Sequence, residues 1–405
     1  MRYSLCSLRL LCGLGGFKKI LRHSRFIDLL LPEKEIMTSK ERVYAALRRQ
    51  KPDRVPIFMW FHPITAERLA AELDLPKNLL GVALGDDVRQ AWVGNNHAME
   101  GIVHERDGEG HSDDWGIDWV KQGPFNQIAK SPLENAPKEE LKNYKFPFSK
   151  IDQLLENMNA ILPLQDEYFI GCDISPCLFE LMCRLRGMEE AIMDLADIDN
   201  SVEKIYDEAT RFAVELGEAA CQRFPMDWFW TGDDVGGQFD LIMNPKIWRQ
   251  FMKPRLMKIF DVGKKHNLYV AYHACGAIRE IIPDLIEMGM DVLNPIQANC
   301  PGMDPIELKR EFGKYISFMG GVDTVELLPR ATAETIFRET KNLIEKMTED
   351  GGGYILSASH TVPPETPLEN IFAMYEAAGL SKEEIFDRAN DLRKGENQGN
   401  SRTEN

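Results

Sequence analysis

The sequence has few cysteines, no long apolar run and a deficit of basic residues. Eight cysteines in 405 residues are too sparse for a disulfide scaffold, so we expect reduced thiols and a cytoplasmic location. No apolar run reaches the roughly 18 residues needed to span a bilayer, so a membrane is not an expected partner. The 48 Lys and Arg against 64 Asp and Glu leave a formal charge of −16, which repels nucleic acid and anionic membrane surfaces.

The remaining composition is that of an ordinary globular protein. Hydrophobic residues make up 44%, charged residues 28% and aromatic residues 9% of the chain. These fractions exclude wholesale disorder, collagen and coiled coil. The length suits one large α/β domain of about 250 to 350 residues with additions.

The two ends of the chain differ from the rest. Residues 1–36 hold seven basic and three acidic residues, and we expect Met37 to be the true start. Thr38 and Glu41 form a capping box that predicts a helix over 39–49. A targeting segment and a structural arm are the alternatives for residues 1–36. Residues 394–405 are polar and predict a disordered tail, which leaves 37–393 as a single domain.

From Val55 onward, short apolar runs alternate with long helical patterns, which is typical of a parallel sheet. Eight strands with crossover helices predict a (β/α)8 TIM barrel. The regular pattern fails after the second strand, where we expect an inserted antiparallel ribbon at about residues 95–125. The strands are predicted at 55–60, 87–93, 168–171, 227–230, 268–272, 292–295, 315–319 and 353–356. The helices between them are predicted at 200–224, 245–266, 278–288, 305–312 and 333–347.

Polar residues gather near the strand ends, where such a barrel places its active site. The carboxyl ends of all strands open on one face, so residues far apart in sequence can meet there. Any single Asp among them can instead cap the helix that follows. The polar candidates for substrate binding and catalysis are Asp86, Asp87, Asp233, Asp234, Gln238, Asn294 and Gln297.

One motif carries metal chemistry. The segment 268–276 runs from a β-rich stretch into a Gly turn, and alternation places His273 and Cys275 on the same side. Zn²⁺ accepts imidazole and thiolate ligands together, and a catalytic site uses three protein ligands and one open position. His360, after the eighth strand, or Cys300, after the sixth, completes the set. A packed thiol beside a hydrogen-bonded histidine is the alternative interpretation of the pair alone.

Other histidines and the aromatic residues have weaker assignments. His62 follows the first strand, where it binds substrate or caps a helix. We interpret three histidines of the inserted ribbon as surface residues. Aromatic side chains near the strand ends suit an apolar substrate, with barrel core as the alternative. The ribbon histidines are His97, His104 and His111, and the aromatic residues are Trp60, Phe61, Trp92, Trp228 and Trp230.

Eight short motifs form a combined pattern over roughly residues 38 to 380. They are Val55-Pro56-Ile57, Gly232-Asp233-Asp234, Pro254-Arg255, His273-Ala274-Cys275-Gly276, the stretch 291–295, Met303-Asp304-Pro305, the stretch 318–323 and Pro367-Leu368-Glu369-Asn370. The combination resembles the uroporphyrinogen decarboxylase superfamily. The resemblance implies a (β/α)8 barrel and one of two chemistries: cofactor-free porphyrinogen decarboxylation, or zinc-dependent methyl exchange with a corrinoid.

Departures from the family pattern favour the second chemistry. The decarboxylases carry arginines after the first strand, whereas this sequence has none over residues 58–63. A substrate with many carboxylates would lose its bidentate partners there. Asp86 or Asp87 matches the essential Asp of the decarboxylases, so a lyase stays open. The methyltransferases carry a distant third Cys, and this sequence has His360 at that position, as the decarboxylases tend to have.

These observations predict a zinc-dependent methyltransferase. It moves a methyl group between a small substrate, either an O-methyl compound or a thiol, and a corrinoid. The corrinoid comes on a partner protein, because the chain has no Asp-x-His-x-x-Gly cobalamin signature. One alternative is a cofactor-free decarboxylase acting on a smaller acid, and another is a non-catalytic small-molecule-binding barrel. The sequence leaves a homodimer open.

Overall fold

Seven parallel strands form the main sheet of the structure, a computed structural model in which residues 37–96 and 104–400 are described. Their order in the sheet follows their order in the chain, and each neighbouring pair is parallel. The strands are β1 (Val88–Trp92), β5 (Phe169–Asp173), β6 (Trp228–Gly232), β7 (Tyr269–His273), β8 (Val292–Asn294), β9 (Ser317–Val322) and β10 (Tyr354–Ala358). These are seven of the eight predicted strands.

The eighth position is the extended segment 55–61, which joins β10 to β1. Ile57 bridges Leu356 in parallel and Phe61 bridges Val362. On the other side, the backbone N–H of Asp87 donates to the carbonyl oxygen of Ile57 at 2.7 Å. Pro56 has no N–H, and the N–H of Ile57 donates to the Asp87 carboxylate at 2.8 Å. The segment therefore makes bridges instead of a full ladder, and the predicted TIM barrel is confirmed.

The barrel interior is a packed apolar cluster. Period-two alternation sends Val88, Phe169, Trp228 and Ile355 from four different strands to the axis, where all four are buried. Helix α1 (Ser39–Leu47) supplies Val43 and Leu47 to the same cluster, so it closes the amino end of the barrel. Its capping box is present as predicted. The carboxyl ends of the strands are left open for a site.

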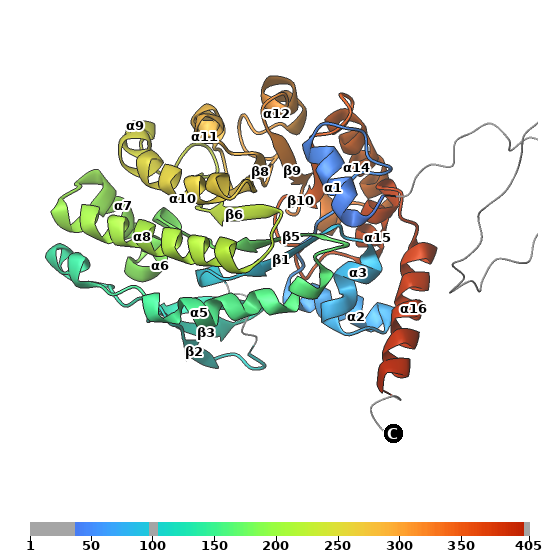
Figure 1. The fold of residues 1–405 in the computed structure, drawn as a ribbon, viewed down its shortest axis with the longest axis horizontal. Helices are drawn as coiled ribbons and strands as arrows, with labels where there is room; N and C mark the ends of the chain where they lie inside the picture. Colours follow the sequence, from blue (N-terminus) through green and yellow to red (C-terminus); the bar gives the residue numbers. More distant parts are fainter. Residues whose placement is uncertain (1–36, 97–103, 401–405) are drawn as a thin grey trace, which may run out of the picture. The chain divides into compact units, whose positions relative to one another are not determined.

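Helices surround the sheet on its outer face, and Figure 1 shows α8, α10, α11 and α12 following one another there. The main helices are α2 (Pro63–Leu73), α3 (Leu80–Leu84), α5 (Ile151–Leu154), α6 (Phe179–Arg186), α7 (Met188–Ala196), α8 (Asn200–Arg223), α9 (Pro245–Ile247), α10 (Lys253–Lys265), α11 (Ile282–Met288), α12 (Pro305–Phe312), α13 (Leu327–Arg330), α14 (Ala333–Met347), α15 (Leu368–Ala377) and α16 (Lys382–Asn400). Short 3₁₀ turns are η1 (Lys77–Leu79), η2 (Lys138–Asn143), η3 (Phe148–Lys150), η4 (Leu155–Ala160), η5 (Leu162–Leu164) and η7 (Arg279–Ile281), and Trp248–Met252 is a π-helix.

The inserted ribbon is a separate antiparallel sheet of three strands. They are β2 (Gly110–Ser112), β3 (Asp118–Gln122) and β4 (Phe125–Lys130). The insertion lies after the second strand of the barrel, as predicted, although its last strand extends to Lys130 instead of ending near residue 125. Its β3–β4 hairpin contributes to the cavity described below.

Residues at both ends of the chain lie outside the described part of the structure. Residues 1–36, for which the sequence left a mis-called start, a targeting segment or a structural arm open, lie outside the described residues. Residues 394–400, predicted as part of a disordered tail, are the last turns of α16, whereas 401–405 lie outside the described range. Within the described part of the chain, no helix has both the length and the apolar character that crossing a membrane requires.

Candidate metal and substrate site

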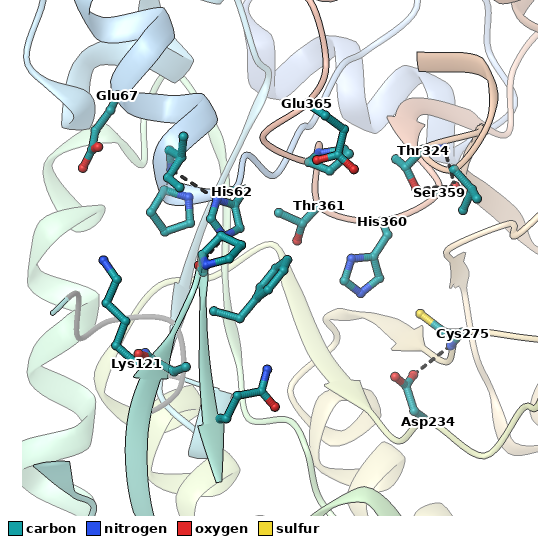
Figure 2. A pocket seen from close by; sticks show the side chains of 18 of the residues that line it. His62, Glu67, Lys121, Asp234, Cys275, Thr324, Ser359, His360, Thr361 and Glu365 are labelled. Carbon is teal, nitrogen blue, oxygen red and sulfur yellow. Dashed lines mark hydrogen bonds between the residues drawn. The ribbon is translucent and has the colours of Figure 1, made fainter. Parts of the chain in front are cut away.

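Three side chains from two separate strands meet at the open end of the barrel. His273 is the last residue of β7, Cys275 follows it by two, and His360 follows β10 by two residues. Their ligand atoms lie within 4.8 Å of one another. Figure 2 shows the Cys275 sulfur and the His360 ring facing each other. Among the described residues, the structure thus brings together the predicted pair and one of its two proposed completing residues.

A glycine turn sets the position of Cys275. Gly276 has a φ of +87°, a conformation that favours glycine. A Cβ atom at this position would also lie 2.6 Å from the backbone of Gly236. Any larger residue therefore forces the loop after β7 away from the loop after β6. This turn explains why the sequence reads Cys-Gly here.

Hydrogen bonds orient both ends of this loop. The Nδ1 atom of His273 is 2.6 Å from Oδ1 of Asn294, the last residue of β8. The backbone N–H of Cys275 donates to Asp234 at 2.8 Å, and the N–H of Gly276 donates to Oε1 of Gln297 at 2.8 Å. Because an amide oxygen accepts only, Nδ1 of His273 donates to Asn294, and Nε2 faces the sulfur of Cys275. Asn294, Gln297 and Asp234 thus take supporting positions around the pair.

The types of the three donors, and the distance between two of them, fit a tetrahedral zinc ion. Zinc–sulfur bonds of about 2.3 Å and zinc–nitrogen bonds of about 2.0 to 2.1 Å place the donors of a tetrahedral site about 3.3 to 3.6 Å apart. The distance between Nε2 of His273 and Sγ of Cys275 is 3.5 Å. Two imidazoles and one thiolate also leave the fourth position for a substrate atom, as catalytic zinc requires.

The protonation of two of these groups depends on their surroundings. Burial raises the pKa of Cys275, and the negative charge of Asp234 raises it further. Part of the His360 ring faces the cavity, yet the loss of surrounding water lowers its pKa, and His273 lowers it further. Without a metal, Cys275 is therefore a thiol and His360 a neutral imidazole. A divalent cation favours the thiolate and binds the neutral imidazole directly.

A cavity of about 1000 Å³ opens from this cluster. Asp234, Cys275, Gln297 and His360 line it. Its far end is formed by residues of α2, the β3–β4 hairpin and the loop after β10, as Figure 2 shows for its labelled members. These are His62, Glu67, Lys121, Phe125 and Glu365. The cavity is wide enough for a small substrate and part of a second reactant.

His62 holds the hairpin at the far end. Its Nδ1 accepts from the N–H of Ile64 at 3.2 Å, so it caps α2. Its Nε2 is 2.8 Å from the carbonyl oxygen of Pro124, and its ring meets Phe125 edge-on at 4.9 Å. The predicted cap is confirmed, and His62 also lines the cavity, so its substrate binding stays a prediction.

Asp86 and Asp87 lie at the opposite end of the barrel, so their predicted place at the active-site face is wrong. Both precede β1 and therefore belong to the amino end of that strand. Asp87 forms ion pairs with Arg42 and Arg54. Asp86 accepts from the hydroxyl of Tyr375 on α15, and burial raises its pKa to about 7. These carboxyl groups hold elements together far from the cluster.

Three further candidates are not part of the cluster. Asp233 is buried and accepts from the N–H groups of Phe179 and Glu180, so it caps α6. Gln238 contacts the carbonyl oxygen of Asn299 at 3.5 Å and does not line the cavity. Cys300 is buried with its sulfur 3.9 Å from Oδ1 of Asn299 and does not join His273 and Cys275. The geometry therefore favours His360 over Cys300 as the third ligand.

The aromatic candidates separate into two groups. Trp228 and Trp230 are buried in the barrel core. Trp60 is only partly buried, and its ring lies 5.7 Å from that of His273. Of the ribbon histidines, His104 and His111 bond to each other at 2.9 Å and are half-buried, whereas His97 lies outside the described residues. Trp60 and the buried Trp230, whose ring lies 6.3 Å from that of His273, thus both reach the cluster.

The sequence interpretation missed the residues of the far wall. Lys121 and Phe125 belong to the ribbon, which had no predicted part in the site, and Glu365 lies between two prolines after His360. Alternation within the ribbon indicates a sheet but not where its hairpin folds. No local pattern in the sequence marks these residues as cavity lining.

The fold and this cluster define a TIM-barrel enzyme with a candidate metal centre at the carboxyl face. The model of the uroporphyrinogen decarboxylase family matches residues 121–379. The chain belongs to this family, as its motifs predicted. The family match, together with the relatives described next, also confirms the expectation of an enzyme.

The relatives come from both chemical branches. The chain is 23% identical over 84% of its length to a methylcobamide:CoM methyltransferase, MtbA, of Methanosarcina mazei, of which 97% is covered. It is 21% identical over 68% of its length to a methylated-thiol–coenzyme M methyltransferase of the same species, 71% covered. A uroporphyrinogen decarboxylase of Thermus thermophilus is 25% identical over 42% of this chain and 45% of its own. A solved methyltransferase from Methanosarcina mazei shares the fold with a TM-score of 0.62, at 20% identity, over 85% of this chain and 98% of that one.

Proposed function

We propose that this enzyme is a zinc-dependent methyltransferase. It moves a methyl group between a small methylated substrate, an O-methyl compound or a thiol, and a corrinoid that a partner protein carries. The observation that carries the proposal is the convergence of His273, Cys275 and His360 at the barrel mouth. The relatives that match most of the chain support it, because their names describe methyl transfer from a corrinoid or a methylated thiol.

The residues of the cluster would hold the metal and position the substrate. His273 would bind through Nε2, with Asn294 holding its Nδ1 proton. Asp234 fixes the backbone of Cys275, and Gln297 fixes the turn that follows. Zinc, when bound, would act as a Lewis acid on the sulfur or oxygen atom of the substrate. The ring of Trp60 lies 5.7 Å from that of His273 and would help to hold this imidazole in place.

The corrinoid would approach from the open end of the cavity. The corrinoid, when bound, would supply the nucleophile that accepts the methyl group. The substrate sulfur or oxygen would keep the pair of the broken bond and take up a proton. The chain itself has no cobalamin signature, so the cofactor would arrive with its own protein.

The structure disfavours the alternative of a cofactor-free lyase. That alternative requires Asp86 or Asp87 as the charge-stabilising group at the substrate. Both carboxyl groups lie at the amino end of β1, and Asp87 is fully buried between two arginines. Neither carboxyl group belongs to the lining of the cavity.

We expect Asn294→Ala to weaken zinc binding by about 10- to 100-fold, the usual effect of losing a hydrogen-bond partner of a metal-bound imidazole. The fold should persist, because the substitution leaves the backbone pairing of β8 intact. A competition titration with a zinc-sensitive dye measures the change. Asn299→Ala, an exposed Asn in the loop after β8, is the matched control and should bind zinc like wild type. Equal zinc affinity in both variants would remove Asn294 from the site.

The activity test follows the corrinoid directly. Zinc-loaded protein is mixed with cob(I)alamin and a series of methoxylated and S-methylated compounds, and the absorption spectrum reports conversion to methylcobalamin. The proposal expects turnover with at least one compound and loss of turnover in His273→Ala. Turnover that persists in metal-free protein would contradict it.

A further inference from the structure

The charges that line the cavity are mostly negative. Four carboxylates and two cationic side chains belong to the described lining, and the chain as a whole carries a formal charge of −16. A cleft lined mostly by charges of one sign concentrates their electric field on a molecule that enters the cleft. The carboxylates are Glu67, Glu105, Asp234 and Glu365, and the cations are Lys121 and Arg330.

Both cationic side chains already have oxygen partners. The ammonium group of Lys121 donates to the carbonyl oxygens of His104 at 2.8 Å and Glu105 at 3.2 Å. Arg330 pairs with Glu326 at 2.7 Å, and its side chain is 68% exposed. Within the described lining, Lys121 is thus held by backbone oxygens of the ribbon, and Arg330 lies in an exposed ion pair.

The histidine at the far end adds no positive charge. Nδ1 of His62 accepts from the N–H of Ile64, which requires that this nitrogen carry no proton. Its Nε2 then donates to the carbonyl oxygen of Pro124. Burial also lowers the pKa of His62, which agrees with a neutral ring. Both ring nitrogens are used within the protein.

One carboxylate of the far wall, Glu365, has a cation nearby but no ion pair, because Arg68 donates to the carbonyl oxygens of Pro364 and Thr366 on either side of it. Glu365 is exposed to the cavity and makes no ion pair with any described residue. Glu67, beside it in the lining, pairs with Lys77 at 3.1 Å, away from the cavity lining. A ligand that reaches from the metal cluster toward α2 therefore approaches the carboxylate of Glu365.

From this arrangement we infer that the enzyme selects a reactant whose tail is neutral or positively charged and discriminates against anionic tails. The inference rests on the proposed function, because the tail is the part of the substrate remote from the atom held at His273, Cys275 and His360. We therefore expect this enzyme to differ in substrate from the relatives whose names contain coenzyme M, a thiol with a sulfonate tail. It also disfavours a small acid as substrate.

A matched series of thiols tests the inference. The probes are 2-aminoethanethiol, 2-mercaptoethanol and 2-mercaptoethanesulfonate, which share a two-carbon spacer and differ in the charge of the tail. Their dissociation constants are measured by calorimetry on the zinc-loaded full chain at low salt. The variants are Glu365→Gln and, as a matched control, Glu345→Gln, an exposed residue of α14 outside the cavity lining.

We expect the amine to bind about tenfold or more tightly than the sulfonate, with the alcohol between them. Glu365→Gln should reduce the amine-to-sulfonate ratio by about 2- to 5-fold, as expected for one partly screened charge. Glu345→Gln should leave the ratio unchanged, and added salt should shrink it. Because the ratio is compared between variants, differences in thiol acidity cancel.

Two kinds of failure are distinguishable. A chain that binds no zinc contradicts the proposed function before any thiol is added. A chain that binds zinc but holds the sulfonate as tightly as the amine, keeps the same ratio in Glu365→Gln, or binds none of the three thiols, overturns only the inference about the tail.

Discussion

The purified protein should carry one zinc ion per chain, and His273→Ala, Cys275→Ser and His360→Ala should each lose it. The three ligand atoms lie within 4.8 Å of one another, and removing one leaves two protein ligands. Two ligands hold zinc far more weakly than three, so we expect an affinity loss of at least about 100-fold. Elemental analysis after gel filtration measures the zinc content.

Cys300→Ser is the matched control for this prediction. Its sulfur is buried beside Asn299 and does not join the cluster, so this variant should keep its zinc. Loss of zinc in Cys300→Ser together with full zinc in His360→Ala would show that the third ligand had been assigned wrongly. Full zinc in all four variants would place the metal elsewhere.

Asp87→Ala should destabilise the fold by about 3 to 5 kcal/mol, the usual cost of removing one partner of a buried ion pair. The carboxylate is fully buried and contacts Arg42 at 2.5 Å and Arg54 at 2.8 Å. It also accepts the N–H of Ile57, which no strand partner would satisfy in its absence. The free energy of unfolding in urea, followed by circular dichroism, measures the change.

The same variant separates a structural role from a catalytic one. Asp387→Ala, an exposed carboxylate on α16, is the control and should unfold like wild type. Asp87→Ala should unfold at lower urea, and its folded fraction should still bind zinc. If Asp87→Ala unfolds like wild type but has no activity, Asp87 acts in the reaction and the lyase alternative returns.

Most of the fold could be predicted from the apolar periodicity of the sequence and from the residues that begin or end helices and strands. The predicted bounds of α12 (Pro305–Phe312) and α14 (Ala333–Met347) match the structure, because apolar periodicity marks each helix and a capping side chain, Asp304 or Thr332, marks its start. The segment 55–60 was predicted as a strand but makes only bridges, since Pro56 lacks an N–H and a carboxylate takes the N–H of Ile57. The carboxylate that accepts this N–H belongs to Asp87, 30 positions along the chain, so no local pattern predicts it.

Residues of the site could be predicted only where the direction of a strand decides at which end of the barrel a residue lies. His273 and Cys275 end a strand of clear polarity, so their place at the carboxyl face followed directly. Asp86 and Asp87 stand before their strand, and grouping them with residues that follow strands put them at the wrong end. The choice between His360 and Cys300 depended on how two loops bend. Neither loop carries a periodic pattern that a sequence can report.

The most direct test of the account is X-ray absorption spectroscopy at the zinc edge on the purified full chain. Three protein ligands of the proposed kind predict one sulfur at about 2.3 Å and nitrogen or oxygen neighbours at about 2.0 to 2.1 Å, with imidazole scattering from two rings. A spectrum with two sulfurs at zinc, with no imidazole, or with no zinc at all would contradict the claim that His273, Cys275 and His360 form the metal centre.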